Sequence, residues 1–413
     1  MLLSLLKGLT GAALLNVLFL SENMDTGGTQ KEILGLCREL RKLGHHLWIA
    51  SNGGSLIAEI RNAGIRHCAL PYRSGRRGFL PLAVMSLPLC LYRTIRTIKL
   101  GRIDVVHAYT YLLPMTIASL ACRICRVPLV ITLNDGILEH QAMLSIVKSS
   151  GILEKADTVV FISAEIRNMT CDRRHNGDDR DRTIVIPNMV DLEEVDAAKD
   201  RTLAEPDSDS RCSSTILWVS RLTPDKIDAV VSVIKSAPAI RQRFPRARVI
   251  IVGHGLRHNQ VLELAKEVNR RVGDRAVIVT GFVKDVLSVI WSSDVVVGMG
   301  KVAIEAMACA KPVVVVGHIV GRSGGNFGGL VTKENIRDHQ SCNYSGRGSR
   351  LISTPNLVSG ACTTLLANKE YRKMLGQFGR EHVEQVHDSR KIAKQLEHVY
   401  ACAVRGARQA RMR

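Results

Sequence analysis

Three segments place glycines or cations after predicted strands, where they could bind an anion. Gly27 and Gly28 open the first predicted helix, and Gly300-Lys301 opens a later one. Glycines let a ligand approach the backbone, and the amides at a helix N-terminus favour negative charge. Arg221 and Lys226 follow another strand, and two cations there suit a diphosphate. Each pair alone also fits an ordinary tight turn or solvated surface charge.

Two further side chains could contact the sugar part of a ligand. Glu305 falls near the first turn of the helix that Lys301 opens, where a carboxylate can accept both hydroxyls of a ribose or simply offset the helix dipole. His107 ends a predicted strand. Its imidazole can donate to a substrate oxygen, or it can be a hydrogen-bonded core residue, as a lone histidine more often is.

Other chemistries lack the residues that they need. The segment Gly253-His254-Gly255 is not a dinucleotide fingerprint, because His258 stands where the last glycine belongs. The 11 cysteines are scattered, which fits reduced thiols in a cytosolic protein, and the close pair Cys122 and Cys125 lies in an apolar helical pattern. The D-x-D sequences at 179–181 and 207–209 lie in polar loops, so we expect no metal site.

Short Val- and Ile-rich runs alternate with helical patterns and must position these residues. They predict parallel sheets covered by helices. The first set of predicted strands is 16–20, 47–50, 104–107, 129–132, 158–162 and 183–186. The second set is 215–219, 248–252, 276–280, 294–297 and 312–316. Two such series predict an α/β protein with two Rossmann-like domains that bind ligands at the carboxyl ends of their strands.

The length of 413 residues suits two or three domains. We expect an N-terminal domain over 1–192, a polar linker over 193–214 and a C-terminal domain over 215–370. A C-terminal helix with a basic tail, over 371–413, is expected to pack back on the N-terminal domain. No apolar run reaches the roughly 20 residues that a membrane span needs.

The net charge of +19 comes from 57 basic against 38 acidic residues. Such a surface attracts phosphates, nucleic acid or anionic lipid. With only 4% aromatic residues and no recognised module, a nucleic-acid partner is not expected. Basic residues flank the apolar stretch 78–92, which suits docking on an anionic membrane and equally suits a buried helix with a basic face. Residues 1–13 fit a short extra helix that could lie on the membrane.

Taken in order, these segments resemble the retaining glycosyltransferases of the GT-B fold, specifically glycosyltransferase family 4. The resemblance rests on Gly27-Gly28-Thr29-Gln30, on 104–108, on 185–191, on Val219-Ser220-Arg221-Leu222 with Lys226, and on Glu305-Ala306-Met307-Ala308 with Lys311-Pro312-Val313. The chain departs from the family pattern at two positions. Val297 stands where the E-x7-E motif has its first glutamate, and Asn134 stands where many members have a histidine.

The resemblance implies two domains facing across a cleft and glycosyl transfer that uses a nucleotide sugar as co-substrate, with no metal or other cofactor. Arg221 and Lys226 would neutralise the diphosphate leaving group. Glu305 would hold the ribose, and the amides around Gly300, with Lys301, would cradle phosphate. His107 would touch the sugar. Gly27 and Gly28 would lie beside donor and acceptor.

The expected protein is therefore a hexosyltransferase that acts on a lipid-linked or cell-envelope glycan acceptor. We expect it in the cytoplasm, peripheral on the inner face of the membrane. Val297 favours an alternative, a catalytically weak nucleotide-sugar-binding or regulatory protein on the same fold. A nucleic-acid binder is a third hypothesis, which rests on the net charge alone.

Overall fold

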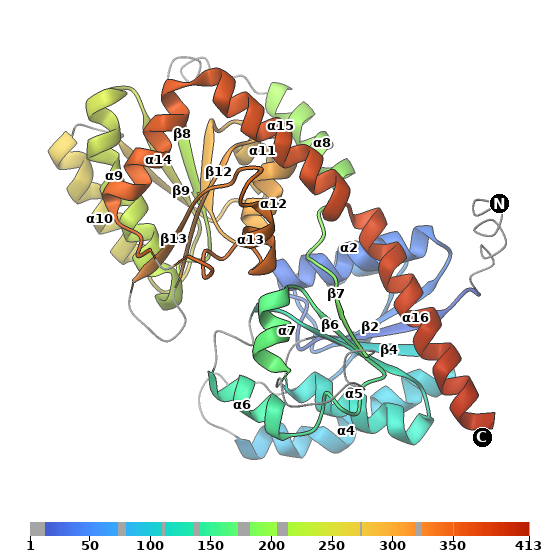
Figure 1. The fold of residues 1–413 in the computed structure, drawn as a ribbon. Helices are drawn as coiled ribbons and strands as arrows, with labels where there is room; N and C mark the ends of the chain where they lie inside the picture. Colours follow the sequence, from blue (N-terminus) through green and yellow to red (C-terminus); the bar gives the residue numbers. More distant parts are fainter. Residues whose placement is uncertain are drawn as a thin grey trace, which may run out of the picture. The chain divides into compact units, whose positions relative to one another are not determined.

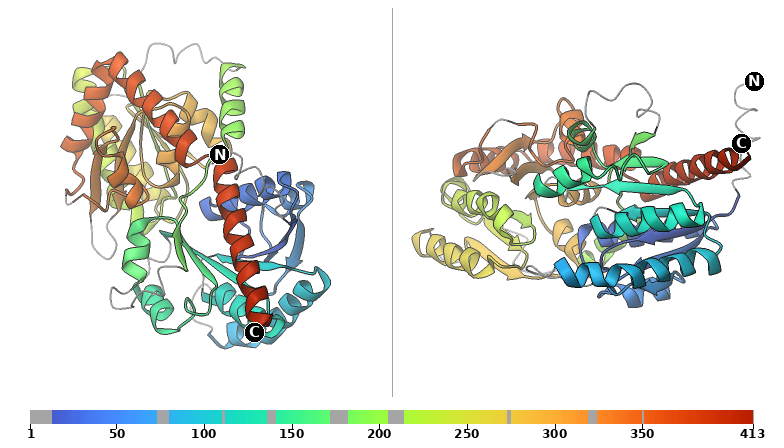
Figure 2. Two further views of the ribbon diagram at one scale, coloured as in Figure 1. Left: turned by 45° about the vertical axis from the view of Figure 1, so that its right-hand side comes forward. Right: turned by 90° about the horizontal axis from the view of Figure 1, so that it is seen from below.

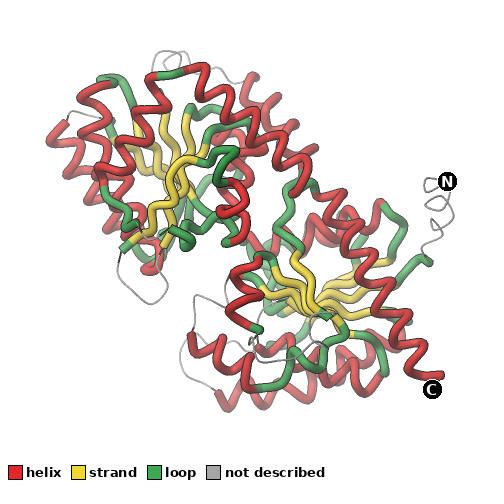
Figure 3. The backbone as a smooth tube through the Cα atoms, viewed as in Figure 1, coloured by secondary structure: helices red, strands yellow, loops and turns green. Residues whose placement is uncertain are grey.

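The computed structural model describes residues 13–72, 80–109, 112–135, 141–171, 182–204, 214–272, 275–318, 324–349 and 351–412. They form two compact units, one of residues 1–189 and 389–413 and one of residues 190–388. In each unit, helices cover a central sheet (Figures 1, 2 and 3). The predicted helix over 1–13 falls outside the described residues except for its last residue, as do both D-x-D sequences and the first two residues of 78–92.

The first unit contains a seven-stranded parallel sheet in the order β3-β2-β1-β4-β5-β6-β7. Its strands are β1 (Asn16–Leu20), β2 (His46–Ser51), β3 (Arg66–Ala69), β4 (Val105–Tyr109), β5 (Leu129–Leu133), β6 (Thr158–Phe161) and β7 (Thr183–Val185). The strand order reverses between β1 and β4. In a doubly wound sheet, ligands bind outside the carboxyl ends of the strands at such a switch point.

Helices cover both faces of the first sheet. Figure 1 shows α2 (Gly28–Lys42) and α16 (Ser389–Met412) on one face and α4 (Leu80–Leu100) and α5 (Leu112–Cys125) on the other. The unit also contains α3 (Ile57–Asn62), α6 (Gln141–Ser149) and α7 (Ala164–Thr170). Alternate strand residues such as Val17 and Phe19 pack with Ile33 of α2 and Leu396 of α16 in one buried cluster. The last helix of the chain is therefore part of the core of the first unit.

The second unit contains a six-stranded sheet in the order β10-β9-β8-β11-β12-β13, and only β13 runs antiparallel to its neighbour. Its strands are β8 (Thr215–Val219), β9 (Arg248–Val252), β10 (Val277–Gly281), β11 (Val295–Gly298), β12 (Val313–His318) and β13 (Gly325–Leu330). The order reverses between β8 and β11, which defines the switch point of this unit.

Two buried clusters sandwich the second sheet. One packs the sheet against α9 (Ile227–Arg243), α10 (His258–Val272) and α14 (Pro355–Ala367). The other packs it against α8 (Leu192–Ala204), α11 (Val286–Trp291), α12 (Lys301–Ala308) and α15 (Lys369–Val386). The short helices η5 (Pro224–Lys226) and α13 (Ile336–Ser341) complete the unit.

The predicted linker over 193–214 is wrong in its first part, because this part is the helix α8. Its Val195 and Ala198 are buried one turn apart, while the intervening residues face solvent. The indole of Trp291 donates to the Val195 carbonyl at 2.8 Å, and Arg201 pairs with Asp285 at 2.8 Å. The polar composition of this segment therefore reflects the exposed side of a docked helix.

The C-terminal segment over 371–413 is two helices, and only the second of them packs back on the first unit as expected. Helix α15 packs against α12 in the second unit, and α16 packs against α2 in the first. The change occurs at His387-Asp388, where the His387 carbonyl accepts the Val190 amide at 2.7 Å. The two chain segments that connect the units, at Val190 and at Asp388, thus lie side by side. No helix among the described residues combines the length and apolar character of a membrane span.

Candidate functional site

In the first unit, the glycine loop lies at the carboxyl end of β1, beside the switch point. Gly27 caps α2 in an extended conformation, and its carbonyl accepts the Lys31 amide at 3.0 Å. A side chain at Gly28 would meet no atom within 4 Å, so the backbone there is open. The amide of Asn134, after β5, donates to the Thr29 hydroxyl at 3.0 Å. The fold thus joins two segments that the sequence separates by about 100 residues.

His107 does not lie in such an open position. It points from β4 into the core and has no exposed surface. Its Nδ1 lies 2.7 Å from the Tyr400 hydroxyl, and its Nε2 lies 2.7 Å from the Thr132 hydroxyl. Burial lowers the pKa of His107 to about 3, so the imidazole is neutral at physiological pH. This arrangement contradicts the expectation that His107 touches the sugar and matches its alternative, a hydrogen-bonded core residue.

In the second unit, the Ser220–Leu222 turn after β8 is held against the loop after β9. The Leu222 amide donates to the His254 carbonyl at 3.1 Å. Gly253 and Gly255 have φ values of +153° and +156°, and a Cβ on Gly253 would lie 1.9 Å from the Ser220 carbonyl oxygen. These two glycines are therefore required by the close approach of two backbones. They fix the turn that carries Arg221.

Arg221 and Lys226 both lie at the carboxyl end of β8. Arg221 is exposed, while its neighbour Leu222 is buried and anchors the turn. Lys226 ends η5 and is the N-cap residue of α9, and it is half-buried. Two cations and the amino end of a 17-residue helix thus occur on one side of the switch point. This arrangement attracts an anion.

The Gly298–Lys301 loop lies on the other side of this switch point, after β11. Gly300 has a φ of +57° and caps α12, and its amide donates to the Tyr344 carbonyl at 3.1 Å. The first amides of a helix have no acceptor within it, so those of Lys301 and Val302 can serve a ligand. Glu305 lies one turn after Lys301, on the same side of α12, and is half-buried.

The position of Val297 explains one departure from the family pattern. Val297 lies inside β11, paired in register with Trp218 of β8 and Val314 of β12, and has no exposed surface. It belongs to the buried cluster under α9. The chain therefore presents an apolar side chain within the core where the family motif has its first glutamate.

The segment Cys342–Ser345 was not predicted to lie near the site, because it belongs to a polar run over 333–355 in which the sequence shows no helix or strand pattern. Its Tyr344 carbonyl receives the Gly300 amide, and a Cβ on Gly317 would lie 1.7 Å from the Ser345 carbonyl oxygen. The segment therefore lies against the carboxyl ends of both β11 and β12. A short polar run with no apolar periodicity gives no signal of this contact.

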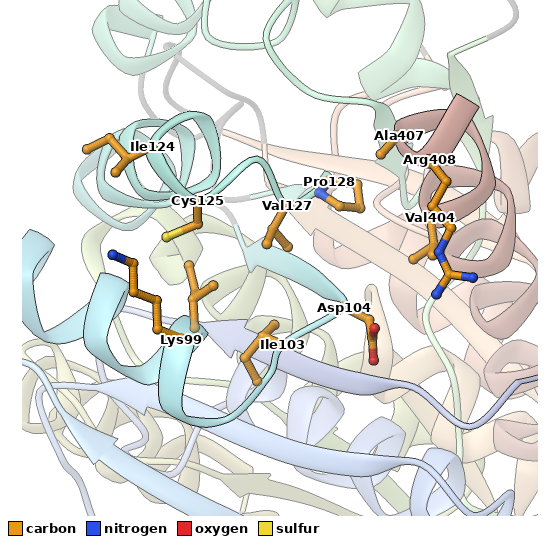
Figure 4. A pocket seen from close by; sticks show the side chains of 11 residues that line it. Lys99, Ile103, Asp104, Ile124, Cys125, Val127, Pro128, Val404, Ala407 and Arg408 are labelled. Atoms are coloured by element: carbon orange, nitrogen blue, oxygen red, sulfur yellow. The ribbon is translucent and has the colours of Figure 1, made fainter. Parts of the chain in front are cut away.

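A pocket of about 360 Å³ in the first unit lies elsewhere, at the amino ends of β4 and β5 (Figure 4). Ile103 and Asp104 precede β4, Val127 and Pro128 precede β5, and Arg408 reaches the pocket from α16. Since the glycine loop lies at the opposite ends of the strands, this pocket is not part of the candidate site. Across the described ranges, no three His, Cys, Asp or Glu side chains group closely enough to hold a metal ion.

Two doubly wound units define the GT-B class of glycosyltransferases. Residues 26–194 match the family described as Glycosyltransferase Family 4, and residues 213–338 match Glycosyl transferases group 1. The two matched regions together span most of the chain. The protein belongs to the family 4 type of GT-B glycosyltransferases.

Similar proteins share this class. The phosphatidyl-myo-inositol mannosyltransferase of Mycobacterium tuberculosis is 26% identical over 237 residues, which are 55% of this chain and 57% of that enzyme. The structure of Anabaena HepE in complex with UDP and glucose has a TM-score of 0.69 at 18% identity, and the match covers 94% of this chain and all of HepE. Sucrose-phosphate synthase from Thermosynechococcus elongatus has a TM-score of 0.66 at 20% identity, over 94% and 98% of the two chains.

Proposed function

We propose that the protein transfers a sugar from a nucleotide sugar to a lipid-linked or cell-envelope glycan, with retention of configuration and without a metal ion. One observation carries this proposal. Arg221 and Lys226 follow β8, Gly300 and Lys301 follow β11, and these two strands flank the switch point of the second sheet. Fixed cations and helix amides at this point suit a diphosphate.

The residues take separate roles in the proposed reaction. As the bond between the sugar and the diphosphate breaks, negative charge develops on the leaving phosphate oxygen. Arg221 and Lys226 stabilise this charge, which lowers the barrier more than it strengthens substrate binding. Lys301 and the first amides of α12 hold the phosphates, and the Glu305 carboxylate accepts the ribose hydroxyls. In the first unit, the open backbone at Gly28 leaves room for a substrate beside the Gly27-Gly28 loop.

The similar proteins support the substrate classes. HepE binds UDP and glucose in its crystal structure, which favours a nucleoside diphosphate sugar as donor. The mannosyltransferase that resembles part of this chain is named for phosphatidyl-myo-inositol, which favours a lipid acceptor. The net charge of +19 suits the anionic groups of both substrates.

Calorimetry in chelator-treated buffer tests the donor site. The wild type is expected to bind one of UDP, GDP, ADP and TDP, and the double variant Arg221→Ala, Lys226→Ala is expected to weaken that binding at least 100-fold, since each charged contact is worth roughly 1.5–3 kcal/mol. Lys235→Ala, Arg243→Ala is the matched control, because it removes the same charge from exposed positions of α9. Equal affinity in the two double variants would contradict the proposed site.

Turnover distinguishes the enzyme from its alternative. Val297 is buried and apolar at the position where the family motif has a glutamate. The missing carboxylate favours a protein that binds a nucleotide sugar without transferring it. The proposed enzyme releases nucleoside diphosphate when a membrane extract supplies the acceptor. Tight binding of the nucleotide sugar with no release above that of the Arg221→Ala variant would support the binding protein instead.

We also propose that the first unit docks on the cytoplasmic face of an anionic membrane through α4 and α5. Leu89, Tyr92 and Leu100 of α4 are exposed apolar side chains, as are Leu120 and Ile124 of α5. Exposed basic residues lie among them: Arg96, Lys99, Arg102, Arg123 and Arg126. Exposed apolar and basic side chains on neighbouring helices suit a lipid surface.

Vesicle flotation tests this docking. The protein is expected to float with vesicles that contain anionic lipid and to remain in solution with neutral ones. Arg96→Glu, Lys99→Glu should abolish flotation, because each basic residue contributes about 1 kcal/mol near the surface. Lys333→Glu, Lys373→Glu makes the same charge change at exposed positions of the second unit. Flotation that does not depend on lipid charge would overturn the proposal.

A further inference from the structure

We propose that the pocket at the amino ends of β4 and β5 binds one acyl chain of an anionic membrane lipid, and that Lys99 binds the head group of this lipid. The pocket has a volume of about 360 Å³, within the roughly 300–1,000 Å³ of small-molecule sites. It lies where the last turns of α4, α5 and α16 approach the starts of β4 and β5 (Figure 4). The inference extends the membrane docking proposed above and does not involve the donor site.

The walls of the pocket are aliphatic. The side chains of Ile98, Ile103, Val127 and Val404 come from four different segments of the chain and line the pocket together. None of the described lining residues is aromatic, so the pocket offers no ring on which a nucleotide base could stack. Aliphatic walls suit a hydrocarbon chain, because each methylene group that leaves water favours binding.

The charged groups of the pocket favour an anionic head group. Lys99 and Arg408 lie on opposite sides of the pocket in Figure 4, and both are exposed. Neither cation forms an ion pair within the described part of the chain. Asp104 also lines the pocket, but its carboxylate accepts the Asn16 amide at 2.8 Å. Two cations against one carboxylate leave an excess of positive charge, which attracts an anion.

The edge of the pocket adjoins the surface that we propose to dock on the membrane. Ile124 lines the pocket and is 56% exposed, and Lys99 precedes Leu100, which is 74% exposed. An acyl chain that leaves the lipid layer would therefore enter the pocket beside the side chains that contact the membrane. This continuity favours a membrane lipid as the occupant over a free metabolite.

Cys125 provides a reporter of occupancy. Its thiol lines the pocket and is half-buried; burial raises the pKa of this thiol, and the nearby Lys99 opposes that rise. Cys402 is exposed on α16 and is not a lining residue, so it serves as an internal control. The probe is dodecanoyl lysophosphatidic acid below its micelle concentration, and lysophosphatidylcholine with the same chain is its zwitterionic counterpart. Mass spectrometry of peptides follows the alkylation of both cysteines by iodoacetamide.

The anionic lipid is expected to slow the alkylation of Cys125 about threefold or more and to leave that of Cys402 unchanged. The zwitterionic lipid should protect Cys125 less. In calorimetry, Lys99→Gln should weaken binding of the anionic lipid about three- to tenfold, as expected for the loss of one basic residue beside an anionic head group. Arg123→Gln is the matched control, because it removes the same charge from an exposed position of α5 outside the lining.

Ala407→Phe tests the cavity itself. Ala407 is half-buried where α16 borders the pocket, so a phenyl ring there should occupy the space of the chain and abolish lipid binding. Ala401→Phe makes the same change at a half-buried position of α16 outside the lining and should preserve binding. Equal alkylation of Cys125 with and without the anionic lipid would overturn the proposal, as would equal protection by the two lipids. Because the lipids are monomeric in this test, protection in a protein that does not float with vesicles would support the pocket and refute the docking.

Discussion

The hydroxyl of Tyr400 lies 2.7 Å from Nδ1 of His107, and 293 residues separate the two in the sequence. Their rings cross at 73° with centroids 5.7 Å apart. The second imidazole nitrogen is bound to Thr132. Both ring nitrogens of this fully buried histidine thus have hydrogen-bond partners. These two bonds connect β4 with β5 and with α16.

Tyr400→Phe should destabilise the first unit by about 1–3 kcal/mol, because it leaves a buried imidazole nitrogen without its partner. Hydrogen exchange of β4 peptides measures this change in the affected unit. Tyr92→Phe is the control, since Tyr92 is 59% exposed in the same unit and its change should stay within about 0.5 kcal/mol. Equal protection in the two variants would show that the hydrogen bond contributes nothing.

The low pKa of His107 predicts how stability depends on pH. The folded value of about 3 lies below the ordinary value of 6.5, so the unfolded chain binds the proton more readily between these limits. The contribution of His107 is complete above pH 6.5 and falls by up to about 1.4 kcal/mol for each pH unit below it.

His107→Gln provides the comparison, because glutamine does not titrate. Hydrogen exchange of β4 peptides gives the free energy of unfolding of each protein. From pH 7.5 to pH 5.5, the wild type should lose about 1 kcal/mol of this free energy relative to the variant. A constant difference across this range would show that the buried imidazole does not resist protonation.

Gly253→Ala should weaken nucleoside diphosphate binding at least tenfold. The added methyl group would meet the Ser220 carbonyl, so the turn that carries Arg221 must move. Gly360→Ala is the matched control, because a Cβ there meets nothing within 4 Å and alanine favours the interior of α14. It should preserve affinity and raise stability by up to about 1 kcal/mol. Normal affinity in Gly253→Ala would remove the link between this contact and the site.

Val297→Glu restores the residue type of the family motif but should not improve transfer. The carboxylate would enter the core between β8 and β12, at a cost of several kcal/mol. We expect a lower unfolding temperature for the second unit, whereas Met374→Glu, at a 56% exposed position of α15, should have little effect. A stable variant with faster turnover would show that β11 can turn this side chain toward the substrate.

The pattern of apolar residues predicts the central strands, because a strand buried on both faces is a short run of apolar residues. The strands over 16–20, 215–219 and 248–252 have the predicted bounds. The edge strands β3 and β13 were missed, since Arg66–Ala69 is short and partly polar and Gly325–Leu330 holds three glycines. Their conformation comes from pairing with β2 and β12, which no local pattern records.

The site residues that could be predicted are those that come after the ends of strands. Gly27, Gly28, Arg221, Gly300 and Lys301 do follow β1, β8 and β11. The burial of His107 depends on Tyr400, which local sequence cannot supply. The contact of the Gly300 amide with the Tyr344 carbonyl joins two separate loops, so it too appears only in the folded chain.

The return of the chain to the first unit sets an order of events on the ribosome. Residues 190–388 are all synthesised before α16, so the second unit can fold while the first still lacks its last helix. At about 5–20 residues per second, Tyr400 emerges roughly 15 to 60 s after His107. During that interval, the face of the first sheet that α16 will cover stays open. A nascent chain stalled before Ser389 should therefore be a target for chaperones that bind exposed apolar surface.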